Sequence, residues 1–251
     1  MVLSDVGSSD TVHDHPAELM SASSVKRPRV EEPGRNIGVV HSRRPSLEEE
    51  GSTTETVQIF SASKKHEWRL DPPPCARNLI IADSNFRGVE TVPAGWHMVV
   101  LPGAKFRHVM EALERGREVN RSRLEVVYLQ VGINHRDDRG LAEPEFRETL
   151  RCLRKIATII RYVGISCSRA LPGRERDNIL RINRKWRELT DGYVYPISSS
   201  EVRVRTGDRF AIHYDGETVR KVMQSILDFH GAHASAKSNV GEKKTATPKG
   251  D

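Results

Sequence analysis

The sequence contains only three cysteines in 251 residues, at Cys75, Cys152 and Cys167. An odd number without regular spacing excludes a disulfide framework and fits a reducing compartment. No apolar run approaches the ~20 residues that a membrane span needs. The first residues lack the basic segment and apolar stretch of a signal peptide. We therefore expect an intracellular protein, cytoplasmic or nuclear and not secreted.

The usual signatures of nucleotide and metal sites are also missing. Neither GxxxxGK[ST] nor GxGxxG occurs, so no phosphate-binding loop is indicated. His135 with Asp137 and Asp138 is the densest group of possible metal ligands, and we interpret it as a solvated loop. The residues directly before and after Cys167 are serines, so no adjacent basic residue would activate its thiol. We expect no metal and no organic cofactor.

Composition divides the chain into three regions. Residues 1–74 are rich in Ser, Thr, Pro, Gly and Glu and lack a sustained apolar period, which predicts a disordered N-terminal region. Within it, Lys26–Arg29 is a short basic cluster of the nuclear-import type, and Ser46 lies between basic and acidic residues, as kinase sites often do. Residues 75–231 form the predicted domain, and residues 232–251 form a predicted disordered basic tail.

Between these flanks, strand and helix patterns alternate. Apolar runs predict strands at Leu79–Ala82, Trp96–Leu101, Leu124–Val131, within Thr158–Ser166 and at Tyr193–Ile197. Apolar residues at helical spacing predict helices around Phe106–Leu113, Phe146–Ala157, Ile179–Leu189 and Val219–Leu227, the last of them capped by Asp215. This alternation favours a three-layer α/β/α fold with a flavodoxin-like parallel sheet of about five strands.

Polar residues follow three of the predicted strands where each strand ends. Asp83, Gly103 and Gly132 all occur at predicted carboxyl ends. In open α/β sheets the ligand site lies beyond this edge. Ser84 follows Asp83 directly, and His213 precedes the last predicted helix. A serine hydroxyl needs a base within hydrogen-bond reach to act as a nucleophile, so this combination points to acyl transfer.

The order of these short segments resembles the SGNH hydrolases, also called GDSL-like lipases or esterases. Asp83-Ser84-Asn85 is similar to the first block of that family, Gly103 to the second, Gly132-Ile133-Asn134 to the third and His213 to the fifth. The resemblance covers roughly residues 77–231. The segments LPGAKFRHVMEAL and LQVGINHRDD also resemble a branch of this family carried by metazoan retroelements.

The resemblance implies a role for each matched residue. Ser84 would be the nucleophile and His213 the general base, with Asp83 and Asn85 in support. The oxyanion hole would consist of the backbone N–H groups of Ser84 and Gly103 and the side-chain amide of Asn134. Three further histidines compete with His213 for the role of base: His97, His108 and His135.

The sequence departs from the family pattern at the residue that orients the histidine. Phe210 occupies the position three residues before His213, where the family usually has an acid. Asp208 would reach the imidazole if the loop bends, and Asp215 follows it, but neither has the usual spacing. A Ser84 and His213 dyad assisted by a backbone carbonyl is the third arrangement that remains open.

Two functions of different classes therefore remain open. In one, the protein is a serine esterase that acts on a small-molecule ester through an acyl-enzyme. In the other, the site is degenerate and the fold serves as a binding module. The chain has a formal net charge of +6 and many arginines between residues 107 and 187, so RNA, DNA or an acidic protein is the partner expected for such a module.

Overall fold

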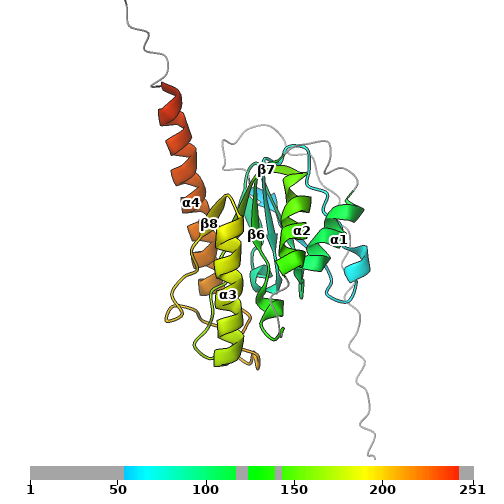
Figure 1. Ribbon diagram of the computed structural model, residues 1–251, viewed down its shortest axis with the longest axis vertical. Coiled ribbons are helices and arrows are strands. Elements are labelled where there is room, and N and C mark those ends of the chain that lie inside the picture. Colours follow the sequence, from blue (N-terminus) through cyan, green and yellow to red (C-terminus); the bar gives the residue numbers. More distant parts are fainter. Residues whose placement is uncertain (1–53, 117–123, 139–142, 243–251) are drawn as a thin grey trace, which may run out of the picture. The chain divides into compact units, whose positions relative to one another are not determined.

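A computed structural model describes residues 54–116, 124–138 and 143–242 of the chain (Figure 1). Lys26–Arg29 and Ser46, which the sequence analysis singled out, lie outside the described residues. In the described part of the chain, no helix has the length and apolar character that crossing a membrane requires.

Six parallel strands form the central sheet, in the order β2-β5-β3-β6-β7-β8. They are β2 (Gln58–Ile59), β3 (Asn78–Ala82), β5 (Trp96–Val100), β6 (Leu124–Gln130), β7 (Ala157–Val163) and β8 (Gly192–Val194). Apart from the edge strand β2, the order is that of flavodoxin-like folds, as the sequence predicts. A separate antiparallel ribbon consists of β1 (Thr54–Thr56) and β4 (Thr91–Pro93).

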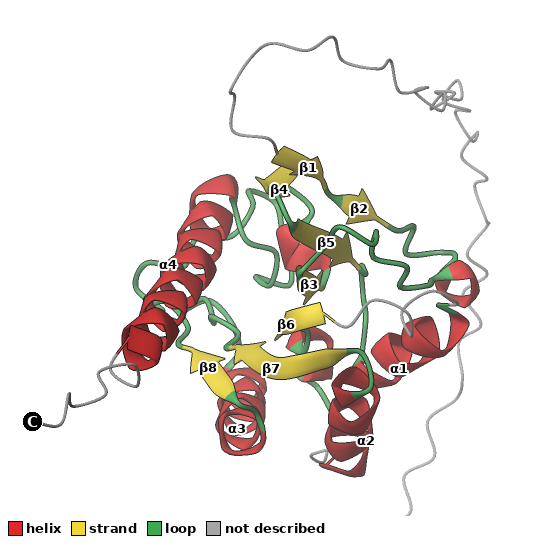
Figure 2. Cartoon of the chain, turned by 90° about the horizontal axis from the view of Figure 1, so that it is seen from above, coloured by secondary structure: helices red, strands yellow, loops and turns green. Residues whose placement is uncertain are grey.

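Helices cover both faces of the sheet, which gives the three layers that the sequence predicts (Figures 1 and 2). One face packs against α1 (Phe106–Arg115), α2 (Glu143–Arg154) and α3 (Gly173–Leu189). The opposite face packs against α4 (Gly216–Glu242). Three short 3-10 helices complete the described elements: η1 (Lys65–Glu67), η2 (Ser84–Phe86) and η3 (Ile133–His135).

The sequence patterns explain these elements. Every residue of β3 is buried, because a central parallel strand covered by helices on both faces has no solvent side. In α1, Phe106, Val109 and Leu113 recur at helical spacing and enter the core below the sheet. Helix α4 begins after Asp215, whose carboxylate accepts a hydrogen bond of 2.8 Å from the backbone N–H of Thr218. Asp215 is therefore the helix cap that the sequence predicts.

The strand register aligns the three predicted carboxyl ends. Ala82, the last residue of β3, pairs with Val100 of β5 on one side and with Gln130 of β6 on the other. The loops that follow these strands therefore leave the sheet at the same level. We call this edge the carboxyl rim; it carries the segments that begin at Asp83, Leu101 and Val131.

The predicted disorder of residues 1–74 is wrong for residues 54–74. This stretch contains β1, β2 and η1, and the side chains of Trp68 and Leu70 are fully buried in the core beside α1. Two isolated large residues create no apolar period, so composition alone conceals their contribution. The edge strand β2 also raises the strand number from about five to six.

Three other boundaries differ from the predictions. Helix α4 continues to Glu242, so the predicted disordered tail does not begin at residue 232. Strand β8 ends at Val194, because Pro196 cannot continue a hydrogen-bonded ladder. Ala157 begins β7 and does not end α2, since a turn over Lys155 and Ile156 separates the two elements.

Candidate active site

Ser84 lies at the carboxyl rim and is the first residue of η2, which follows β3. Its side chain is 4% exposed, and its hydroxyl has no hydrogen-bond partner among the described residues. Asp83 fixes the turn, because its Oδ1 accepts a hydrogen bond of 3.0 Å from the backbone N–H of Asn85. The serine hydroxyl thus lies at the end of the strand and makes no structural hydrogen bond within the described residues.

Asp83 itself is completely buried. Burial raises the pKa of its carboxyl group to about 7, although the nearby backbone N–H groups of Asn85, Ile133 and Gly132 act to lower the pKa. Asn85 is also completely buried, and its side-chain amide has no partner among the described residues. The two residues that the resemblance names as supporting are therefore internal, beneath the serine.

Gly103 and Asn134 lie close together on the same rim. The Nδ2 group of Asn134 donates a hydrogen bond of 3.1 Å to the carbonyl of Ala104, the residue after Gly103. This bond uses one of the two amide hydrogens of Asn134 and leaves the other for a ligand. Gly103 has a φ of 77°, a conformation that favours glycine, and Lys65 Nζ donates to its carbonyl at 2.9 Å.

The loop after β6 depends on glycine for another reason. Gly132 has a φ of 150°, and a Cβ atom there would lie 2.6 Å from Cδ1 of Ile165. The close approach of this loop to the segment after β7 therefore excludes a larger residue. Asn134 follows two residues later. The close packing at Gly132 therefore helps to position the side-chain amide of Asn134.

His213 forms a pair with Asp208 on the loop before α4. Its Nδ1 lies 3.2 Å from Oδ2 of Asp208, whose side chain is 7% exposed. The same oxygen accepts hydrogen bonds from the backbone N–H groups of Ile212, at 2.9 Å, and of His213, at 2.7 Å. The Nε2 atom of His213 has no partner among the described residues. This is the bent-loop arrangement that the sequence analysis left open.

The charge state of Asp208 suits an acceptor for the imidazole N–H. Burial acts to raise the pKa of its carboxyl group, but hydrogen bonds from the backbone of His213, Ile212 and Phe210 outweigh burial and lower the pKa. An ionised Asp208 accepts a hydrogen bond from Nδ1–H of His213. In that tautomer the Nε2 atom carries the lone pair. Asp215 has a different task, as the cap of α4.

The loop of His213 is anchored to the segment that follows β7. The hydroxyl of Tyr214 donates to the carbonyl of Ser166 at 2.7 Å and accepts from the N–H of Ser166 at 2.9 Å. Burial raises the pKa of Tyr214 well above its usual value, and the charge of Asp83 acts in the same direction. Direct contact between Ser84 and His213 stays a prediction.

The competing histidines have other partners or positions. His135 is buried: its Nδ1 lies 2.7 Å from Asp138, and its Nε2 accepts from the N–H of Phe106 at 3.1 Å. The interpretation of this segment as a solvated loop is therefore wrong for His135, whereas Asp137 is exposed. Burial is the main cause that lowers the pKa of His108 to about 4. His97 lies at the amino end of β5, away from the carboxyl rim.

Sequence reasoning missed two residues that shape the site. Lys65 contacts Gly103 from the segment that was predicted to be disordered, and no local signal marks it. Tyr214 follows His213 directly, so its position was a signal that the predictions did not use. Among the described residues, no group of three or more His, Cys, Asp or Glu side chains is arranged to hold a metal ion.

Comparisons with known proteins give similar solved structures only. No protein-family model matches the chain, and no curated protein matches it. The chain is similar to a GDSL-like lipase from Bacteroides thetaiotaomicron, with 10% identity, a TM-score of 0.45 and coverage of 69% of this chain and 96% of that one. It is also similar to an acetylxylan esterase from Geobacillus stearothermophilus, with 13% identity, a TM-score of 0.41 and coverage of 61% and 93%.

The resemblance to the retroelement branch stays a prediction. The solved structures to which the chain is similar include a GDSL-like lipase, a member of the family whose blocks its sequence resembles.

Proposed function

We propose that the protein is a serine esterase of the SGNH type, which hydrolyses a small-molecule ester through an acyl-enzyme. The observation that supports this most is the pair of His213 and Asp208, with Nδ1 of the histidine 3.2 Å from the carboxylate and Nε2 without a partner among the described residues. A histidine held in this way is prepared to accept a proton at Nε2.

In the first half-reaction, Ser84 Oγ attacks the ester carbonyl carbon while His213 Nε2 takes the hydroxyl proton. Asp208 holds the imidazole in the required tautomer and stabilises the imidazolium that forms. The tetrahedral intermediate then collapses: the bond between the carbonyl carbon and the alcohol oxygen breaks, and the imidazolium protonates the departing alkoxide. The alcohol leaves, and the acyl group remains on Ser84.

The negative charge on the carbonyl oxygen needs donors that are already in place. The N–H groups of Ser84 and Gly103 have no backbone partner among the described residues, and the side chain of Asn134 keeps one amide hydrogen. These groups come from the ends of β3, β5 and β6, which the register aligns. Removal of one such donor typically costs ~2.7–4 kcal/mol of transition-state stabilisation.

In the second half-reaction, water replaces the alcohol. His213 Nε2 takes a proton from the water as its oxygen attacks the acyl carbon, and the second tetrahedral intermediate releases the carboxylic acid. The proton returns from His213 to Ser84 Oγ, which restores the site. The two half-reactions thus use the side chains of Ser84, His213 and Asp208, the oxyanion donors and water.

The test combines ester turnover with covalent labelling of the full-length protein. We expect the protein to hydrolyse p-nitrophenyl acetate and to react with a fluorophosphonate probe. Ser84→Ala should abolish both, whereas Ser200→Ala, which changes an exposed serine after β8, should leave both unchanged. Labelling that persists in the Ser84→Ala protein would place the nucleophile elsewhere, and no labelling of the unaltered protein would contradict the esterase.

A further inference from the structure

Arg161 is a buried cation without an anionic partner. It lies on β7, is 5% exposed, and its Nη1 donates a hydrogen bond of 2.5 Å to the hydroxyl of Tyr128. No carboxylate lies within ion-pair distance of it among the described residues. A guanidinium has five N–H donors and is costly to bury unless they are satisfied. The remaining donors therefore need water or a ligand.

The surroundings of Arg161 fix its orientation. Its guanidinium carbon lies 5.5 Å from the ring centre of Tyr128 and 4.9 Å from that of Phe229 on α4. Gly192 of β8 packs against the stem, because a Cβ there would lie 3.2 Å from Cγ of Arg161. Aromatic rings that stack on the faces of a guanidinium leave the N–H groups at its edge available. These groups donate hydrogen bonds in the plane of the guanidinium, which is the geometry by which arginine binds carboxylates and phosphates.

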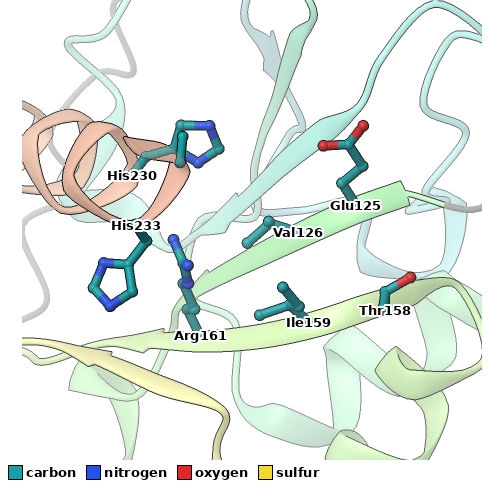
Figure 3. A pocket seen from close by; sticks show the side chains of 8 residues that line it. Glu125, Val126, Thr158, Ile159, Arg161, His230 and His233 are labelled. Carbon is teal, nitrogen blue, oxygen red and sulfur yellow. The ribbon is translucent and has the colours of Figure 1, made fainter. Parts of the chain in front are cut away.

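Arg161 lines a cavity of about 210 Å³ between the sheet and α4. In Figure 3 its side chain extends from β7 toward the histidines of α4. The hydroxyl of Tyr128 lies 3.1 Å from Nδ1 of His230, and Nδ1 of His233 lies 2.8 Å from the carbonyl of Phe229. The Nε2 atom of His233 is thus its free nitrogen among the described residues. In the neutral ring this nitrogen accepts a hydrogen bond from an anion oxygen that carries a proton. In the protonated ring it donates one to an oxygen without a proton.

The one acidic side chain that lines the cavity is Glu125. It is 63% exposed and lies 3.8 Å from Nη1 of Arg77, so its charge has a partner outside the cavity. In Figure 3 it lies beyond Val126, away from the guanidinium. The cavity is smaller than the ~300–1,000 Å³ typical of sites for drug-sized ligands, which favours a compact anion.

We propose that this cavity binds a phosphate group, with Arg161 as the principal donor and His233 as a second contact. A carboxylate has two oxygens, and both would be used by the edge of the guanidinium. A phosphate has further oxygens for an imidazole on the opposite wall. None of the residues that line the cavity belongs to the carboxyl rim that carries Ser84, so the proposal is independent of the esterase.

The test is a calorimetric titration of inorganic phosphate into the full-length protein at constant ionic strength, with sodium acetate titrated in parallel. We expect saturable phosphate binding and no comparable response to acetate. Arg161→Gln should weaken phosphate binding at least about tenfold, because the charge-assisted bonds are lost. Since that change affects a buried residue, its fold is checked by circular dichroism. His233→Ala changes an exposed residue and should weaken binding several-fold.

The control variant is Arg184→Gln, an exposed arginine on α3 without a partner among the described residues. It should bind phosphate like the unaltered protein. Binding that falls equally in Arg184→Gln would indicate general charge attraction and overturn the proposal. It would also be overturned by the absence of saturable binding, by equal binding of acetate, or by unchanged affinity in folded Arg161→Gln and His233→Ala.

Discussion

A histidine acts as a base through one ring nitrogen when a neighbouring group holds the proton on the other. Asp208 is the only carboxylate within ion-pair distance of His213 among the described residues, although the family pattern has its acid three residues before the histidine. Two residues of this loop have a left-handed backbone conformation: Gly207, directly before Asp208, with a φ of 80°, and Ala211, between Asp208 and His213, with a φ of 52°. The turn at Ala211 lies within the stretch that brings the carboxylate and the imidazole together from five positions apart.

The first prediction concerns this carboxylate. Asp208→Asn should lower kcat for ester hydrolysis about a hundredfold or more, because an amide presents the wrong group to Nδ1 and does not stabilise the imidazolium. Steady-state kinetics measure the loss. Asp228→Asn, which changes an exposed carboxylate on α4, is the matched control and should retain full activity. Unchanged kcat in a folded Asp208→Asn protein would remove Asp208 from the mechanism.

At the scale of elements, the side chain of Tyr214 links the loop before α4 to the neighbouring part of the fold. Tyr214 bonds both the carbonyl and the N–H of Ser166, and all of these groups are buried. The hydroxyl therefore joins the segment that carries His213 to the segment after β7. Loss of the hydroxyl would leave two buried backbone groups unpaired, which is costlier than the loss of a solvated bond.

The second prediction follows from this contact. Tyr214→Phe should lower the free energy of unfolding by about 1–3 kcal/mol. Urea denaturation measures the change. Tyr195→Phe alters a tyrosine that is 61% exposed and should have an effect within about 0.5 kcal/mol. If both variants were equally stable, the bridge to Ser166 would not be a structural anchor.

The segment from β1 to η1 belongs to the domain because of its buried side chains. Trp68 has no exposed surface, and its Nε1 donates to the carbonyl of Ser61 at 2.8 Å. The ring of Trp68 thus anchors the segment to the core, and its N–H group stabilises the turn within the segment. This arrangement makes the segment part of the cooperative unit and also holds Lys65 against Gly103.

The third prediction tests that conclusion. Trp68→Ala should destabilise the domain by about 3–5 kcal/mol, the cost of emptying a large buried site. His66→Ala, two residues earlier at an exposed position, is the control and should change stability little. Thermal denaturation compares the two. A Trp68→Ala protein as stable as the control would mean that this segment packs on a domain that folds without it.

At the scale of the whole molecule, a buried carboxyl group links stability to pH. The pKa of Asp83 is about 7 in the folded protein, chiefly because of burial, against an ordinary value of 3.8. Below pH 4 the group is neutral in both the folded and the unfolded states. Between pH 4 and 7 the folded state binds more protons, so stability falls as pH rises.

The fourth prediction is the size of that fall. Raising the pH from about 4 to above 7 should cost roughly 4 kcal/mol through Asp83 alone, with no further change at higher pH. In Asp83→Asn this contribution should disappear, since an amide does not titrate and its oxygen still accepts from Asn85. Urea denaturation of both proteins from pH 5 to 8 measures the difference. Parallel pH profiles would contradict a raised pKa.

The sequence predicted the layers and the rim because both depend on patterns within single elements. Continuous apolar runs mark β3 and β6, since covered parallel strands have no polar face. Strand ends then locate Ser84, Gly103 and Asn134. The strand register, which aligns Ala82 with Val100 and Gln130, arises only when the strands pair, so no single segment reveals it.

Features that depend on the whole fold were not predictable in this way. Trp68 and Leu70 contribute to the core without any period around them. Asp208 reaches His213 across a loop in which Ala211 has a positive φ, a conformation that alanine rarely adopts. Helix α4 extends to Glu242 although the apolar spacing of its first half ends at Leu227.

The central claim is that Ser84 is a nucleophile activated by the pair of His213 and Asp208. The most direct measurement is mass spectrometry of tryptic peptides after treatment of the folded protein with a fluorophosphonate. We predict one modified peptide, NLIIADSNFR from Asn78 to Arg87, in which Ser84 is the sole serine, and loss of the modification in His213→Ala. Modification of a different peptide, or equal modification of Ser84 without His213, would contradict the claim.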